Sequence, residues 1–248
     1  MPGNTLNILG YEIFTGDVEF FSDGFHGVIS TLNPHSYIIA RKDEEFSLAL
    51  KESDVLLADG IGITMAVRIL TGRKIPRTTG SDIHRILINH LDNSKEKCFY
   101  FGAGEATLNK IKDRLSKEHP GITAGFFSPP FKPAFTDEED LTYIKTINDF
   151  NPDVLFVGMT APRQEKWVLK NKNLLNARII CPVGAVFDFY AGTVKRPGKF
   201  WLNTGLEWLP RLLREPGRLW KRMVISAPLF GWYVLIERLK MIFSQKEP

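Results

Sequence analysis

The chain has 248 residues, of which 44% are hydrophobic and 24% charged, with a formal net charge of +4. This composition supports one sizeable buried core and excludes wholesale disorder. Cys98 and Cys181 lie in apolar stretches and are predicted to be reduced core thiols, and without a Cys/His cluster no structural zinc site is expected. The N-terminus lacks a basic stretch followed by a long apolar one, so we expect a cytoplasmic protein without a secretory signal.

Short apolar stretches alternate with helix-like segments along most of the chain. Buried strands are predicted at 27–33, 55–58, 98–104 and 153–159 and within 177–189, with a weaker candidate at 122–127. Helices are predicted from Pro34, around 46–50, across 65–70, from a cap at Asp82, around 111–115, across 137–150 and across 164–169. Apolar strands separated by helices are typical of a parallel sheet covered on both faces. We therefore predict an α/β fold, a Rossmann-like doubly wound domain over 1–195.

Residues 196–248 form a predicted appendage of different composition. Leu, Trp and Phe alternate with Arg and Lys, and the apolar stretch 223–236 is shorter than the ~20 residues that a bilayer span needs. Basic, aromatic-rich helices suit a membrane interface, so we expect the appendage to contact an anionic membrane surface at the inner face of the cell membrane. Packing on the domain itself, or on a second copy in a homo-oligomer, is the alternative.

Ligands of open α/β sheets bind beyond the carboxyl ends of the strands. At five places the residues following a predicted strand are polar or glycine. They are Thr31 and Asn33; Asp59, Gly60 and Gly62; Gly102 and Gly104; Gly158 to Gln164; and Gly184 to Asp188. Because parallel strands end at one edge of a sheet, we predict a single ligand site along that edge.

Asp59 is the candidate general base. It follows four apolar residues and precedes Gly60 and Gly62. Partial desolvation at a strand end would raise its pKa towards that of a useful base, and the glycines would let the backbone approach a phosphate. The alternative is an ordinary turn or helix N-cap aspartate, and the chemistry alone leaves both interpretations open.

Two other segments carry candidate binding residues. Arg77, close to Gly80, could clamp a phosphate, with a surface arginine as the alternative. Gln164 and Lys166 could hydrogen-bond a sugar or a base, with a solvated helix start as the alternative.

Six stretches occur in order: TLNPHS, LLADGIGI, IPRTTGSD, FVGMTAPRQEKW, VGAVFDFYAGTVKRP and GLEWLPRLLREPGRLWKR. Together they resemble the WecG/TagA/CpsF family of bacterial glycosyltransferases, over about Asn7 to Arg222. The resemblance implies inverting, metal-independent transfer of a hexose-type sugar from a UDP-sugar to a sugar on undecaprenyl diphosphate. N-acetylmannosamine, its uronic acid, glucose and glucuronic acid are the candidate sugars, and cell-surface polysaccharide synthesis is the expected context.

The resemblance also implies roles for individual residues, and no cofactor. Asp59 matches the proposed base and Thr31 a substrate contact, while Arg77 and Gln164 match further site residues. Without an Asp-x-Asp metal motif, side-chain cations must neutralise the leaving diphosphate. The arginines expected to do so are Arg211, Arg214, Arg218 and Arg222. The apolar segment continuing to Phe243 departs from the simplest members and predicts stronger membrane attachment.

Two competing functions remain at this stage. A non-catalytic nucleotide-binding module of a membrane polysaccharide-assembly complex would bind UDP without turnover. A nicotinamide or flavin enzyme is disfavoured because the glycine spacing of the dinucleotide fingerprint is incomplete. No nucleic-acid partner is expected.

Overall fold

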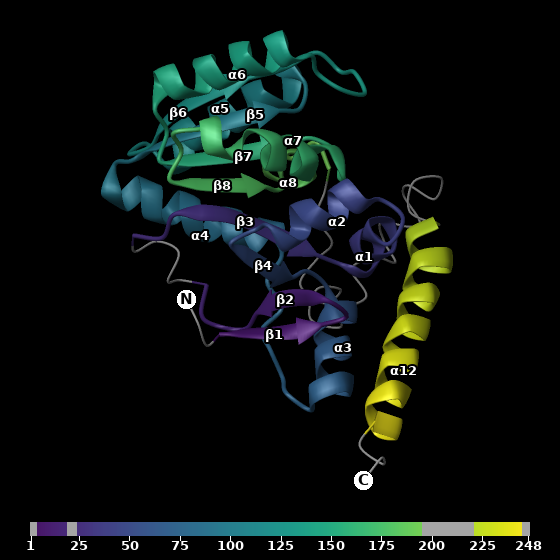
Figure 1. Ribbon diagram of the computed structural model, residues 1–248. Coiled ribbons are helices and arrows are strands. Elements are labelled where there is room, and N and C mark those ends of the chain that lie inside the picture. The colour runs from purple at the N-terminus through teal and green to yellow at the C-terminus, as the bar shows by residue number, and fades with distance from the viewer. Residues whose placement is uncertain (1–3, 19–23, 195–220, 245–248) are drawn as a thin grey trace.

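The computed structural model describes residues 4–18, 24–194 and 221–244, and its centre is a six-stranded parallel sheet (Figure 1). The strand order is β4-β3-β8-β7-β5-β6. The strands are β3 (Gly27–Leu32), β4 (Val55–Ala58), β5 (Lys97–Gly102), β6 (Thr123–Phe127), β7 (Val154–Gly158) and β8 (Ile179–Pro182). Every neighbouring pair in this sheet is parallel, which confirms the predicted α/β class.

Helices cover both faces of the sheet, because the strands carry apolar side chains on both faces. The helices are α1 (Pro34–Ala40), α2 (Glu44–Lys51), α3 (Ile61–Thr71), α4 (Gly80–Ser94), α5 (Glu105–Glu118), α6 (Asp137–Phe150), α7 (Arg163–Asn171), α8 (Val186–Tyr190) and α12 (Ala227–Ser244), with short helical turns at Lys172–Leu174 and Lys221–Ser226. Tyr100 and Phe156 pack with α4, α5 and α8 on one face. Phe101 and Val157, one residue further along their strands, pack with α6 and α7 on the other.

The predicted strands and helices are present, with three differences. A two-stranded antiparallel hairpin, β1 (Thr5–Ile8) and β2 (Tyr11–Phe14), was not predicted. Helix α8 lies in a stretch expected to be strand and loop. Asp82 is not the N-cap of α4: Thr79 is, and Asp82 accepts the Thr79 backbone N–H from the third helical position.

Both cysteines are buried and free, as expected for core thiols. Cys98 lies on β5 and Cys181 on β8. Burial raises the pKa of both thiols well above the usual range, so neither is a reactive thiolate at neutral pH.

Helix α12 lies alongside α1 and α3 at the edge of the molecule (Figure 1). Phe230 and Val234 are buried there, and the Arg41 guanidinium lies 4.3 Å from the centre of the Tyr233 ring. One face of this part of the appendage therefore packs on the core, as the alternative interpretation predicted. No helix of the described ranges combines the length and apolarity needed to cross a bilayer. The domain boundary at 195 falls at the edge of a gap and stays a prediction.

Candidate active site

Backbone hydrogen bonds bring three predicted segments together at the carboxyl ends of β3 and β4. The Asp59 N–H donates to the Leu32 carbonyl over 2.9 Å, and the Thr78 N–H donates to the Ala58 carbonyl over 3.1 Å. Thr31 precedes Leu32, and Arg77 precedes Thr78. Thr31, Asp59 and Arg77 therefore come from three adjacent stretches of backbone, and we call these three residues the β3–β4 site.

Two glycines shape the start of α3 beside this site. Gly60 has φ +88°, and a Cβ there would meet nothing within 4 Å, so the backbone next to Asp59 borders open space. A Cβ on Gly62 would lie 2.4 Å from Pro34 Cγ, so only glycine lets α3 approach the start of α1 this closely. Gly60 is the N-cap of α3, which means that Asp59 does not occupy the capping position of that helix.

The side chains of the β3–β4 site are neither fully buried nor fully exposed. Thr31, Asp59 and Arg77 are each half-buried. Asn33, the next polar residue after Thr31, is the N-cap of α1 and accepts the Ser36 N–H over 2.9 Å. The side-chain oxygen of Asn33 thus has a structural partner, and this hydrogen bond organises the loop that follows β3.

The glycines at the ends of β5 and α4 have packing reasons of their own. Gly102 has φ +121°, and a Cβ there would lie 2.4 Å from the Gly158 carbonyl oxygen of β7. A Cβ on Gly80 would lie 3.2 Å from Val186 Cγ2. The close approach of neighbouring backbone and side chains accounts for both glycines, so their predicted ligand contacts gain no geometric support.

At the ends of β7 and β8 the structure places Gln164 in the interior. Gln164 is 5% exposed, and its amide lies against Gly184, whose φ is +53°. Asp188 on α8 accepts a hydrogen bond from the Thr193 hydroxyl over 3.3 Å. The Lys166 ammonium lies 2.7 Å from Asp43 and 3.1 Å from Glu45, both at the start of α2, and its suggested ligand contact stays a prediction.

Glu165 is a buried acid that the sequence analysis missed. It is 7% exposed, and burial raises its pKa to about 7. Acids in a first helical turn are usually solvated and favourable there, so the residue type alone gave no signal. The apolar Trp167 and Val168 that follow it are a sequence signal that this helix start is enclosed, and both are buried in the structure.

Other predictions lie outside what the structure describes. Arg211, Arg214 and Arg218 fall in the gap at 195–220, and Arg222 falls in a helical turn whose first side chains are not described. In the described ranges, no three His, Cys, Asp or Glu residues are grouped as metal ligands would be.

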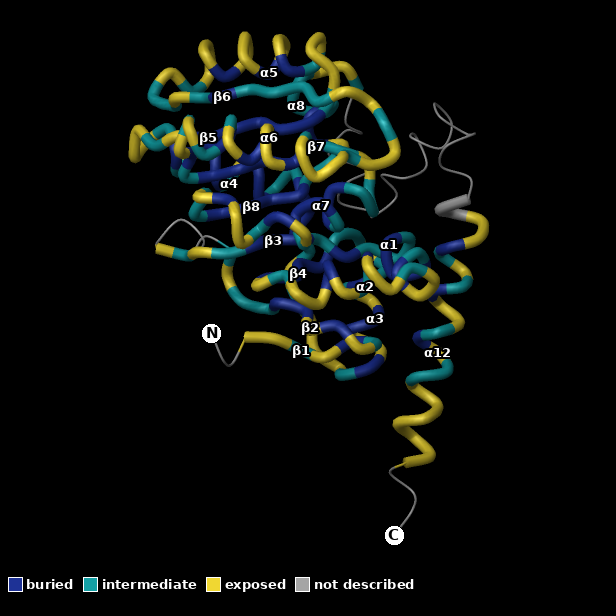
Figure 2. The backbone as a smooth tube through the Cα atoms, turned by 45° about the horizontal axis from the view of Figure 1, so that its top comes forward, coloured by how far each residue is buried: buried dark blue, intermediate teal, exposed yellow. Residues whose placement is uncertain are grey.

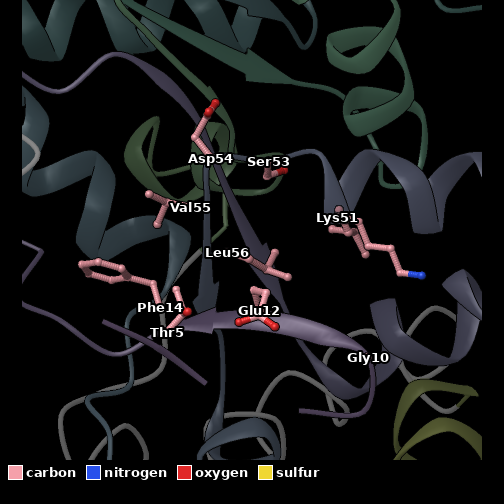
Figure 3. A pocket seen from close by; sticks show the side chains of 10 residues that line it. Thr5, Gly10, Glu12, Phe14, Lys51, Ser53, Asp54, Val55 and Leu56 are labelled. Atoms are coloured by element: carbon pink, nitrogen blue, oxygen red, sulfur yellow. The ribbon is translucent and has the colours of Figure 1, made fainter. Parts of the chain in front are cut away.

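A cavity of about 310 Å³ lies at the opposite end of β4 (Figure 3). Its lining comes from the β1–β2 hairpin, the end of α2 and the start of β4. The carboxylate of Asp54 in this lining accepts the Val28 N–H over 2.8 Å and so begins strand β3. This cavity is distinct from the β3–β4 site, and Asp54 in its lining has a structural task.

Comparison with known proteins is decisive for the class of enzyme. The family described as "Glycosyl transferase WecG/TagA/CpsF family" matches residues 7–243. The chain belongs to this family. The predicted resemblance is thereby confirmed, and the chain is a glycosyltransferase.

Three curated relatives of this WecG/TagA/CpsF member share one name, N-acetylglucosaminyldiphosphoundecaprenol N-acetyl-beta-D-mannosaminyltransferase. The protein from Bacillus subtilis (strain 168) is 33% identical over 211 residues, covering 85% of this chain and 79% of the relative. The protein from Bacillus spizizenii is 30% identical over 238 residues, covering 94% and 90%. The protein from Staphylococcus aureus (strain MW2) is 26% identical over 215 residues, covering 86% and 81%.

Proposed function

We propose that this enzyme transfers N-acetylmannosamine from a UDP-sugar to the N-acetylglucosamine of an undecaprenyl-diphosphate lipid, in cell-wall polysaccharide synthesis. The shared name of the relatives supports the sugar and the acceptor. The observation that carries the proposal is the β3–β4 site, where backbone hydrogen bonds gather Thr31, Asp59 and Arg77 beside the open backbone of Gly60.

In the proposed mechanism Asp59 is the general base. The acceptor hydroxyl binds near Thr31 and Asp59, and Asp59 takes its proton as the oxygen attacks the anomeric carbon opposite the UDP group. The new glycosidic bond forms as the bond to the diphosphate breaks, which inverts the anomeric centre. A base in this position contributes about 10²–10⁴-fold to the rate. A β product formed from an α-linked donor requires such a single displacement, and the relatives' names specify β transfer.

Cations are the proposed means of stabilising the leaving diphosphate. Arg77 supplies one charge from the loop before α4, and Arg211, Arg214, Arg218 and Arg222 supply others from the appendage. Preorganised charges facing a developing anion are among the largest contributions to catalysis. In this scheme side chains take the place that a divalent metal has in other sugar-nucleotide enzymes.

The acceptor's lipid calls for a surface that meets the membrane, and two helices offer one. Ile61, Met65 and Ile69 are exposed at four-residue spacing on α3, immediately after the Asp59-Gly60 turn. Figure 2 shows the outer turns of α12 exposed as well. Trp232, Leu235 and Leu239 share that outward face. We call these six residues the α3–α12 apolar surface.

Basic residues border the α3–α12 apolar surface. Arg68 is exposed on α3, Arg73 and Lys74 are exposed just after it, and Arg238 and Lys240 are exposed on α12. An apolar strip beside cations suits an anionic bilayer surface. We propose that it holds the enzyme peripherally on the inner face of the cell membrane, with the β3–β4 site near the lipid headgroups.

A UDP-release assay tests the proposed function. The full chain is incubated with undecaprenyl-diphosphate N-acetylglucosamine and, in separate reactions, with UDP-linked N-acetylmannosamine, N-acetylmannosaminuronic acid, glucose or glucuronic acid. We expect acceptor-dependent UDP release with the N-acetylmannosamine donor, unchanged by EDTA. UDP binding without turnover of any donor would support the nucleotide-binding module instead, and loss of activity in EDTA would contradict the metal-independent mechanism.

A further inference from the structure

A buried polar pair begins helix α7, where the helix meets the carboxyl ends of β7 and β8. Gln164 and Glu165 are 5% and 7% exposed, and the Gln164 Nε2 group donates to Glu165 Oε1 over 2.9 Å. Acids are seldom this buried unless a specific contact requires them. The contact here is with the Gln164 amide, the very group that the family resemblance places in the substrate site.

Gly184 confines the same amide from the other side. A Cβ on Gly184 would lie 3.1 Å from Gln164 Oε1 and 3.4 Å from Nε2, so a side chain there would press on the amide. Gly184 follows β8, which lies between β7 and β3 in the sheet. The Gln164 side chain therefore reaches from the end of β7 to the residues that follow β8, the strand that lies between β7 and β3.

The Gln164 amide nitrogen has a hydrogen-bond partner, and its oxygen has none among the described residues. Within the described residues, Gln164 Oε1 and Glu165 Oε2 are buried atoms without a hydrogen-bond partner. If the amide turned over, its carbonyl oxygen would face an oxygen of the Glu165 carboxylate, and two acceptors would be in contact whenever Glu165 is ionised. Glu165 thus favours the orientation in which Nε2 points to it and Oε1 points away.

We propose that Glu165 is a positioning residue that fixes the Gln164 amide so that its carbonyl oxygen accepts a hydrogen bond from the bound sugar nucleotide. The Gln164 carbonyl oxygen would accept from a neutral hydrogen-bond donor of the ligand: a sugar hydroxyl, the N–H of an N-acetyl group, or the uracil N–H. Glu165 does not touch the substrate and acts through Gln164. This inference rests on the proposed function, because it takes the carboxyl edge of the sheet as the sugar-nucleotide site.

The test is a double-mutant cycle on nucleotide binding by the full chain, measured by isothermal titration with UDP and with UDP-N-acetylmannosamine. Gln164→Leu and Glu165→Leu are each expected to weaken binding about tenfold, the loss of one directed hydrogen bond. The double variant is expected to be no weaker than Gln164→Leu alone, because the two residues act as one unit. If affinity for both ligands falls equally, the hydrogen bond to Gln164 comes from the nucleotide. If only affinity for the sugar nucleotide falls, the hydrogen bond comes from the sugar.

Two control variants separate positioning from a general effect on the fold. Glu138→Leu makes the same change at an exposed site in the first turn of α6 and is expected to bind as wild type. Glu165→Gln keeps an oxygen that can accept from Gln164, so binding is expected to stay within about threefold of wild type. Wild-type binding by Glu165→Leu, or losses that simply add in the double variant, would overturn the proposal.

A measurement on the unaltered protein covers the case in which Glu165→Leu does not fold. The Gln164 side-chain NH₂ resonances, assigned by their absence in Gln164→Leu, are expected to exchange slowly with solvent; fast exchange would overturn the fixed amide. Failure of the wild-type chain to bind either ligand would overturn the proposed function and this inference together. Normal wild-type binding that Glu165→Leu leaves intact would overturn the inference alone.

Discussion

Gly60 after β4 and Gly102 at the end of β5 both have positive φ, +88° and +121°. A Cβ on Gly102 would lie 2.4 Å from the Gly158 carbonyl oxygen, whereas a Cβ on Gly60 would meet nothing within 4 Å. At β5 the absence of a side chain on Gly102 lets the neighbouring strand β7 pack closely, whereas Gly60 after β4 borders open space. A glycine at a strand end therefore indicates a ligand site only when its surroundings are empty.

The two strand ends also differ in the residues that they bring together. Near β5, the Ser128 hydroxyl donates to the Ala103 carbonyl over 2.7 Å, so the turn is closed by the protein's own groups. Near β4, the half-buried Asp59 and Arg77 lie on adjacent backbone next to the open glycine. We therefore expect chemistry at the β4 end and packing at the β5 end, and the predictions below test that division.

The largest expected effect is that of Asp59→Asn. The amide keeps the size of the side chain but does not accept the acceptor's proton, so kcat should fall by about 10²–10⁴-fold. UDP affinity should stay within a few-fold of wild type, because the base acts in the transition state. Single-turnover kinetics and UDP titration measure the two quantities. The exposed Asp149→Asn on α6 is the matched control, and a similar rate for Asp59→Asn and wild type would remove Asp59 from the role of base.

Alanine at each of the two glycines tests the comparison directly. Gly102→Ala should lower the free energy of unfolding by about 2–5 kcal/mol, from an unfavourable φ and from overlap with Gly158. Gly60→Ala should lower it by about 1–3 kcal/mol, from φ alone, yet reduce kcat more strongly per folded molecule because it adjoins Asp59. Urea unfolding and activity assays report both. Gly104→Ala is the control that has neither penalty, because φ there is −88° and an added Cβ meets nothing within 4 Å, and it should lose only about 1 kcal/mol of N-cap preference. The reverse ranking of stabilities would break the distinction drawn here.

Glu165 lies between the two strand ends, and its burial gives a prediction about pH. Burial raises its pKa from 4.5 to about 7 in the folded chain, so the folded state holds the proton more tightly than the unfolded state. Its contribution to stability is complete below pH 4.5 and is lost as the pH rises through about 7. At pH 8 the free energy of unfolding of Glu165→Gln, measured with urea, should therefore exceed that of wild type by up to about 3 kcal/mol. At pH 4 the two proteins should have equal free energies of unfolding. A stability difference independent of pH would contradict this burial effect.

The sheet and most helices were predictable because each residue type agreed with its local structure. The apolar strands β4 and β7, for example, have no polar alternation and are buried on both faces. The β1–β2 hairpin was missed because its turn puts Leu9 at φ +53°, a conformation that leucine seldom adopts. Local sequence preference gives no warning of such a turn.

For the site, the sequence indicated the residues but not what surrounds them. Asp59 and Arg77 were predicted separately, and the hydrogen bond from Thr78 to Ala58 is what places their segments together. The enclosure of Glu165 depends on the packing of α7 against distant parts of the chain, so a first-turn acid gave no sign of it. Contacts between segments far apart in sequence are the part that local patterns do not encode.

The comparison extends to the helices that follow the two strand ends, and this gives the smallest expected effect. The exposed positions of α5 are mostly charged or polar, whereas α3 exposes Met65 between Ile61 and Ile69. Met65→Glu should weaken binding to vesicles containing anionic phosphatidylglycerol by about tenfold, since a partly buried apolar side chain contributes about 1–2 kcal/mol. Leu141→Glu, the same kind of change at a 60% exposed site on α6, should leave vesicle binding unchanged. UDP affinity should be equal in both variants. Co-sedimentation gives the answer: equal loss in both variants would mean that α3 has no special part in meeting the membrane, and that the open end of β4 does not face the bilayer through this helix.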